Sequence, residues 1–88
     1  MTVKDYEDVI FFRKKEYNIN GWNALDLCAE DLMKLFGDHD VHACTEAMKR
    51  QMLEGDHFIK GDAYTLSKET KVRYYCDNLR PDRRRIFA

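Results

Sequence analysis

The chain has 88 residues, of which 44% are hydrophobic and 35% are charged, and its formal net charge is −1. These values are typical of one soluble globular domain and exclude a disordered chain. A chain of this length buries only about 60 to 65% of its unfolded surface, so we expect modest stability.

Neither a membrane span nor an export signal is evident. The longest apolar run covers residues 9–12, far short of the roughly 20 residues that a span requires. The first residues lack a basic region followed by an apolar block, so no signal peptide is predicted. We therefore expect a cytoplasmic protein, in which the widely spaced cysteines Cys28, Cys44 and Cys76 are free thiols.

The charge is distributed unevenly along the chain. Residues 1–40 carry five Lys and Arg against nine Asp and Glu, whereas residues 41–88 carry ten against seven. A basic half behind an acidic half suggests a binding face for an anionic partner. The alternative interpretation is an uneven but solvated surface.

Residues 3–17 are predicted to form a helix, because apolar side chains recur there at helical spacing and Thr2 can cap its start. A strand through residues 8–12 is the competing interpretation. A turn around Gly21 follows, and Trp22 is expected to anchor this linker onto the core.

The next stretch combines a short extended lead-in at residues 24–27 with a helix that begins at Ala29. Gly37 stands where a helix would end in a left-handed residue. Asp38 or Asp40 can then cap a further helix.

That further helix is predicted over residues 41–53. Turning about 100° per residue, its inward side carries Val41, Cys44, Met48 and Met52. Its outward side carries His42, Glu46, Lys49 and Arg50. We therefore expect a surface helix with one apolar stripe.

Two short strands at residues 57–60 and 63–66 are predicted to form a hairpin across Gly61–Asp62. Residues 67–79 are predicted as a helix, with a strand through residues 72–76 as the alternative. Pro81 ends this element. The domain is thus expected to cover residues 1–80, followed by a mobile basic tail at 81–88.

Taken together, this order resembles that of winged helix-turn-helix domains. The stretch from Leu27 to Gly37 resembles the first helix of the motif, residues 41–53 resemble the second, and residues 57–66 resemble the wing. The resemblance implies a small α+β winged helix-turn-helix with three helices, a hairpin wing and a C-terminal helix. It also implies a non-enzymatic regulator or accessory factor that binds duplex DNA.

By this resemblance, the outward side of residues 41–53 would enter the major groove. The residues nearest the base edges would be His42, Thr45, Glu46 and Lys49. The phosphates would be met by Arg50, Lys60, Lys68 and Lys71, and a basic arm would be formed by Arg83, Arg84 and Arg85. The K49A/R50A variant is accordingly expected to bind duplex DNA more weakly and with a flatter salt dependence.

Acidic side chains lie close to this expected DNA face, namely Glu46, Asp56 and Asp62. Because phosphate repels carboxylate, a nearly neutral monomer would bind poorly at cellular salt. We therefore expect a homodimer, with an interface formed by Tyr74, Tyr75 and Leu79.

No catalytic or metal-binding motif stands out. A zinc site would have to be formed by His39, His42, Cys44, His57 and Cys76, but their spacing fits no usual ligand pattern. Cys44 has no orienting acid or oxyanion element that would make it a nucleophile. We therefore expect neither an enzyme nor a bound metal or cofactor.

The alternative function is a protein–protein interaction module on the same fold. The near-neutral charge and the five Tyr and five Phe favour this interpretation. Small chains of this kind are frequent in phages and mobile elements, where they modulate or inhibit larger complexes.

Overall fold

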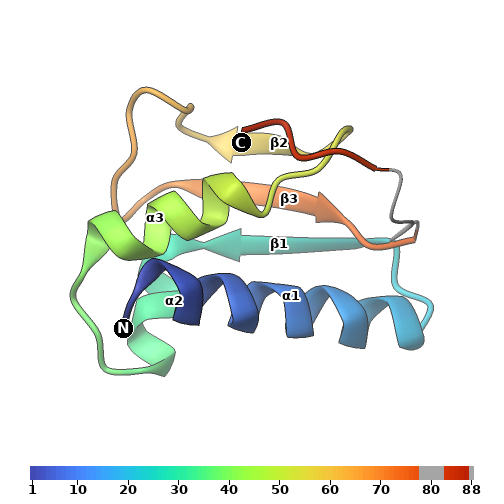
Figure 1. Cartoon of the computed structure of the whole chain (residues 1–88), viewed down its shortest axis with the longest axis horizontal. Helices are drawn as coiled ribbons and strands as arrows, with labels where there is room; N and C mark the ends of the chain where they lie inside the picture. Colours follow the sequence, from blue (N-terminus) through green and yellow to red (C-terminus); the bar gives the residue numbers. More distant parts are fainter. Residues whose placement is uncertain (78–82, 88) are drawn as a thin grey trace.

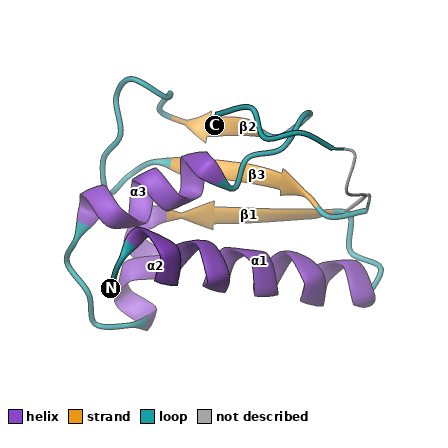
Figure 2. Cartoon of the chain, viewed as in Figure 1, coloured by secondary structure: helices purple, strands orange, loops and turns teal. Residues whose placement is uncertain are grey.

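A computed structural model describes residues 1–77 and 83–87. The described residues form three helices and three strands, in the order α1 (Val3–Ile19), β1 (Ala24–Cys28), α2 (Ala29–Leu35), α3 (Val41–Arg50), β2 (His57–Lys60) and β3 (Lys71–Tyr75). Helices α1 and α3 lie across one face of the sheet, and α2 follows directly from the end of β1 (Figures 1 and 2). The architecture is α+β, as the sequence predicts.

The sheet is antiparallel and has the order β1-β3-β2, so the last strand of the chain lies in the centre. Leu25 of β1 pairs with Tyr74 of β3, and Phe58 of β2 pairs with Val72 of β3. These side chains alternate along their strands with polar ones, as expected where one sheet face is buried. The other sheet face is accessible to solvent and carries the ion pair between Asp26 and Arg73.

One hydrophobic core joins the helices to the sheet. It includes Tyr6 and Ile10 of α1, Leu32 and Met33 of α2, Cys44 and Met48 of α3, and Leu25, Val72 and Tyr74 of the strands. The predicted inward side of α3 is confirmed, because Cys44 and Met48 are fully buried and Met52 is 2% exposed. The helix itself ends at Arg50 and is shorter than predicted.

Helix α1 begins as predicted, with Thr2 as its cap. The Thr2 hydroxyl accepts from the backbone N–H of Asp5, and the Asp5 carboxylate accepts from that of Thr2, which completes a capping box. The sequence did not predict that Lys14 is buried (2% exposed). Its ammonium donates to the carbonyl oxygen of Gln51 and lies 4.7 Å from the centre of the Tyr74 ring.

The turn between α2 and α3 is fixed at three points. Gly37 has a φ of 60°, the left-handed conformation predicted for it. Asp40 caps α3 by accepting from the N–H of Ala43 at 3.0 Å. Asp38 accepts a hydrogen bond of 2.5 Å from the Tyr6 hydroxyl, which ties the turn to α1.

The C-terminal half of the sheet differs from the prediction. Residues 63–66 form no strand of the sheet, and the partner of β2 is β3, which lies where a helix was predicted. Val72 and Tyr74 are buried, whereas the alternating residues Lys71 and Arg73 are only partly buried. This alternation is the period of a strand, and pairing with β1 and β2 on both sides stabilises it.

Residues 61–70 therefore form a long loop between β2 and β3. Its tip is a tight turn, because the Asp62 carboxylate accepts from the N–H groups of Tyr64 and Thr65, both at 2.8 Å. Its base is held by the buried Thr70, whose hydroxyl accepts from the N–H of Ser67. Hydrogen bonds thus fix the loop both near its start, at Asp62, and at its end, at Thr70.

The described part of the C-terminal tail packs on the domain instead of being mobile. The N–H of Glu54 donates to the carbonyl oxygen of Arg84, and the N–H of Ile86 donates to that of Met52. Phe87 packs against Phe58, with ring centres 6.4 Å apart. Residues 83–87 therefore belong to the folded unit, which corrects the predicted domain boundary at residue 80.

Trp22 is also less buried than predicted: it contacts Tyr17 edge to face but remains 52% exposed. Within residues 1–77 and 83–87, no helix is both long and apolar enough to cross a membrane.

Candidate nucleic-acid interface

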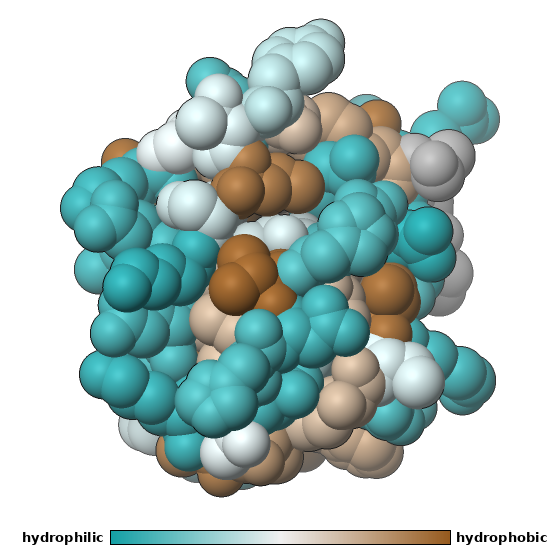
Figure 3. Space-filling model, turned by 90° about the vertical axis from the view of Figure 1, so that its left-hand side faces the viewer, coloured by the Kyte–Doolittle hydropathy of each residue, from teal (hydrophilic) through white to brown (hydrophobic). Residues whose placement is uncertain are grey.

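One end of the molecule gathers cationic and imidazole side chains from separate elements. We call it the end face and define it by Lys34, His39, His42, Lys60 and Lys68, all of which are exposed. These residues come from α2, the α2–α3 turn, the start of α3, the end of β2 and the 61–70 loop. Figure 3 views the molecule from this end, where hydrophilic side chains surround small apolar patches.

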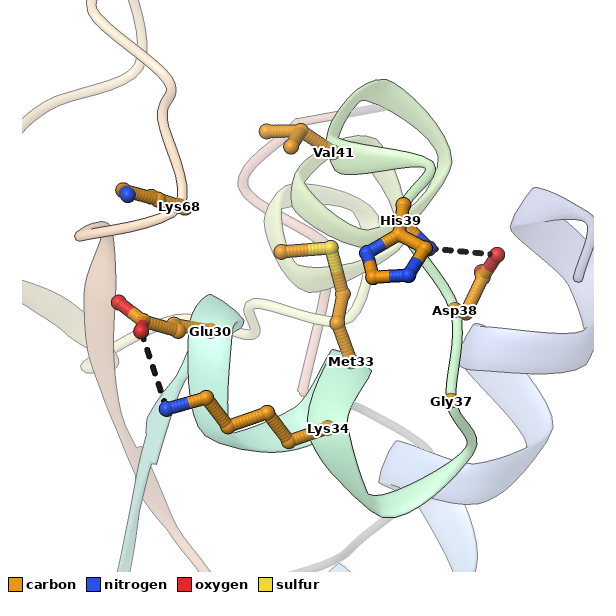
Figure 4. Close-up of a pocket in the computed structure, with 8 residues that line it drawn as sticks. All are labelled: Glu30, Met33, Lys34, Gly37, Asp38, His39, Val41 and Lys68. Carbon is orange, nitrogen blue, oxygen red and sulfur yellow. Dashed lines mark hydrogen bonds and ion pairs between the residues drawn. The ribbon is translucent and has the colours of Figure 1, made fainter.

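A groove of about 370 Å³ runs through the end face. Met33 and Val41 supply apolar lining in its middle, and the remaining lining residues are Glu30, Lys34, Gly37, Asp38, His39 and Lys68 (Figure 4). Glu30 points toward Lys34 at 3.1 Å, on the side of the groove where Lys68 also lies. The groove is therefore lined by both signs of charge.

The 61–70 loop is fastened to the start of α2, which fixes the position of Lys68. The N–H of Glu30 donates to the carbonyl oxygen of Lys68 at 2.8 Å, and the N–H of Ala29 donates to that of Thr70 at 2.9 Å. Cys28 offers no side-chain cap to α2, so the loop carbonyls satisfy the free N–H groups at this helix start.

The predicted base-contacting residues on α3 differ in accessibility. His42 is exposed, as predicted, but Thr45 is only 1% exposed and donates its hydroxyl hydrogen to the carbonyl oxygen of Val41 at 2.8 Å. Thr45 is thus a buried residue, and its predicted contact with base edges is wrong.

The other predicted residues of α3 form ion pairs with one another. Glu46 forms ion pairs with Lys49 at 3.5 Å and with Arg50 at 3.2 Å. The Lys49 ammonium also lies 5.8 Å from the centre of the Phe87 ring. These two cations are therefore already engaged within the protein.

The predicted phosphate-binding residues of the tail are also mostly engaged. Arg83 donates to the carbonyl oxygens of Tyr75 and Glu54 and to the Asp56 carboxylate, which lies 3.0 Å away and is fully buried. Arg85 pairs with Glu7 at 3.1 Å, whereas the Arg84 side chain is exposed. Two of the predicted phosphate contacts, Lys60 and Lys68, lie on the end face. The Lys60 ammonium is 4.0 Å from the Glu69 carboxylate.

The predicted dimer interface includes a residue that does not lie at the surface. Tyr74 is fully buried, and its hydroxyl donates to the carbonyl oxygen of Met48 at 2.7 Å. Tyr75 is half-buried beside His57, with ring centres 5.8 Å apart. Leu79 lies outside the described residues. Tyr74 is a core residue, so its assignment to an interface is wrong.

Two end-face residues, Lys34 and His39, were missed from the sequence. Lys34 stands four residues after Glu30, which marks the exposed side of α2. His39 stands in the capped turn directly before α3. Their exposure could have been predicted from their positions next to the helix ends, because residues that connect two helices usually lie at the surface.

The titratable groups near the turn are tuned by their hydrogen bonds. The Tyr6 hydroxyl donates to Asp38 and holds the pKa of that carboxyl below its usual value, so the contact is a charge-assisted hydrogen bond. Burial raises the pKa of the Cys44 thiol to about 12, which leaves it an inert core residue. Among the described residues, no group of three or more His, Cys, Asp or Glu could hold a metal ion.

No protein-family model matches the chain, and the comparisons with curated proteins and with solved structures find no match either. A function must therefore be inferred from the fold and from the end face.

Proposed function

We propose that the protein is a winged helix-turn-helix protein that binds duplex DNA through its end face. The element order helix, strand, helix, helix, strand, strand supports this proposal, as does the sheet order β1-β3-β2. Helices α2 and α3 form the helix-turn-helix, and the 61–70 loop is the wing. The start of α3 enters the major groove, as the second helix of such motifs does.

The observation that carries the proposal is the convergence of cations from three separate elements. Lys34 of α2 and Lys68 of the loop line the same groove, and Lys60 of β2 lies 4.0 Å from Glu69, the neighbour of Lys68. Phosphate contacts supply most of the affinity for DNA, and cations spread over several elements match the extended backbone of a duplex.

The end face is only moderately basic, because Glu30 and Glu69 pair with Lys34 and Lys60. We therefore infer weak binding by a single copy that weakens further as the salt concentration rises. His42 contacts a base edge, while Lys60 and Lys68 contact the backbone beside it.

The test is a titration of a fluorescent duplex at several salt concentrations. The K60A/K68A variant is expected to lower the affinity, and each lost phosphate contact flattens the slope of log K against log salt by about 0.9. The matched control R84A/R85A removes the same amount of charge from the C-terminal tail, outside the end face, and is expected to leave the slope unchanged. Equal effects of the two variants would contradict the proposed surface.

The K49A/R50A variant is expected to weaken binding less than K60A/K68A does. Both cations are paired with Glu46 on the same helix, so they are less available to the phosphates than Lys60 and Lys68 are. A larger loss of duplex affinity in K49A/R50A would indicate that the contact surface lies nearer the C-terminal end of α3.

A second candidate is a protein-interaction module, and the exposed apolar side chains on α2 favour it. Leu35 is 61% exposed and Phe36 is 45% exposed at the end of this helix. Retention on a heparin column separates the two candidates, because a DNA-binding end face is expected to retain the protein at low salt. An unretained protein with no duplex binding would favour the interaction module.

A further inference from the structure

The outer side of α1 carries large apolar side chains that no described residue covers. Phe12 is 69% exposed, Ile19 is 83% exposed and Phe11 is 44% exposed. Helix α1 lies along one edge of the molecule and packs against α3 and β1 on its inner side (Figure 1). A contiguous exposed apolar stripe marks an interaction site more often than single scattered apolar residues do.

Two opposite charges lie within this apolar surface. At about 100° per residue, Asp8 and Lys15 lie along the middle of the outer side, with Phe11 on one flank and Phe12 and Ile19 on the other. Asp8 is exposed and forms only a surface ion pair of 3.6 Å with Lys4. The Lys15 ammonium lies 5.1 Å from the centre of the Phe11 ring.

We propose that this surface binds a second copy of the chain, with the two α1 helices antiparallel about a twofold axis between Phe11 and Phe12. At a rise of about 1.5 Å per residue, Asp8 and Lys15 lie equally far from that axis on opposite sides. The axis therefore brings Asp8 of each copy opposite Lys15 of the other. The phenylalanines of both copies meet in the centre.

Charge complementarity selects this occupant and this orientation. A twofold interface must be self-complementary, and the antiparallel arrangement pairs opposite charges twice. A parallel arrangement would bring Asp8 opposite Asp8 and Lys15 opposite Lys15, which is unfavourable. Ile19 meets the Lys4 position of the second copy, where the aliphatic part of the lysine can cover it.

The inferred dimer is independent of the proposed DNA binding. No residue of α1 lines the groove of the end face, so both end faces remain accessible when the α1 helices pair. A failure of DNA binding would leave the dimer intact, and a monomeric protein could still bind DNA weakly.

The test measures mass by light scattering during size-exclusion chromatography, over a range of protein concentrations. The wild-type protein is expected to approach twice its 10.5 kDa chain mass as the concentration rises. The F12D/I19D variant is expected to remain monomeric with an unchanged unfolding transition, since both positions are exposed on a helix. The control L35D changes an equally exposed apolar residue of α2 and is expected to dimerise normally.

Charge reversal tests the orientation. D8K and K15D alone each place like charges opposite one another twice and are expected to weaken the dimer roughly tenfold. An equimolar mixture of D8K and K15D is expected to dimerise again, because each heterodimer restores both ion pairs. A monomeric wild-type protein, a dimeric F12D/I19D variant or a mixture that stays monomeric would overturn the proposal.

Discussion

Two groups of cationic side chains, one in the C-terminal tail and one on the end face, have different roles. In the tail group, Arg83 and Arg85 pair with Asp56 and Glu7, and Arg83 is 12% exposed. In the end face, Lys68 is exposed and forms no ion pair with another described residue. The basic appearance of the tail in the sequence therefore reflects structural pairing, whereas the sparser lysines of the end face are the ones that a ligand can reach.

The largest expected effect comes from breaking the buried pair of the tail group. The Asp56 carboxylate accepts from Arg83 and also from the N–H groups of Leu53 and Tyr75. We expect D56A to lower the free energy of unfolding by about 3 to 5 kcal/mol, because it leaves a half-buried guanidinium without its anion. Urea denaturation measures this loss. A loss below that of a typical surface variant would mean that Arg83 is stabilised without Asp56.

The next effect concerns Lys14, a buried cation near Asp56 and the tail group. Burial lowers its pKa to about 8 from 10.5, opposed by the nearby Asp56 and aided by Arg83 and Arg85. Because the folded-state pKa is the lower one, the energetic cost is full below pH 8 and disappears as the pH rises toward 10.5. We expect the wild-type protein to gain roughly 3 kcal/mol over this interval relative to K14M.

The K14M reference removes the effect of the other groups that titrate in this range. Burial also raises the pKa of the Cys76 thiol, which destabilises the folded state at high pH, and Lys14 opposes this rise; both proteins therefore carry C76A, so that this thiol does not enter the comparison. Unfolding in urea at pH 7.5, 9 and 10.5 measures the difference between the two proteins. A constant difference across these pH values would mean that Lys14 is not desolvated.

A smaller effect is expected on DNA binding when Glu46 loses its charge. E46Q releases Lys49 and Arg50 and removes a carboxylate near the phosphates, so the duplex affinity is expected to rise roughly fivefold. The control E54Q removes a carboxylate beside the tail group and is expected to leave the affinity unchanged. An equal rise in both variants would show that net charge matters more than position.

The smallest effect is expected at the exposed pair between Arg73 and Asp26. Arg73 donates two hydrogen bonds to Asp26, at 2.8 and 2.9 Å, on the open face of the sheet. Because both groups are accessible to water, we expect R73A to cost less than about 1 kcal/mol in urea denaturation. A cost comparable to that of D56A would contradict the distinction between buried and exposed pairs.

Local signals predicted the N-terminal half of the fold well. Caps, spacing and the Gly37 turn define α1, α2 and α3, and these features depend on neighbouring residues only. The strand β3 was predicted as a helix because Val72, Tyr75 and Cys76 also fit helical spacing. Pairing with β1 and β2 decides between the two, and such pairing joins residues up to 51 positions apart, as in Ala24 and Tyr75.

The candidate site was predicted only in part for a related reason. The outward position of His42 follows from helical periodicity, and the exposure of Lys60 follows from its place at a strand end. The burial of Thr45 and Tyr74 depends on elements distant in the sequence. The engagement of Arg83 with Asp56 spans 27 positions, and no local pattern reveals such a partner.

The central place of β3 in the sheet has a consequence for the folding of the chain during its synthesis. Because β1 and β2 pair only with β3, neither strand has a backbone partner in the sheet until residue 75 has left the ribosome. Until then the growing chain carries two unpaired strand edges and an open core, which favours association with other chains. We therefore expect a chain truncated after residue 70 to aggregate, because β1 and β2 then lack their shared partner.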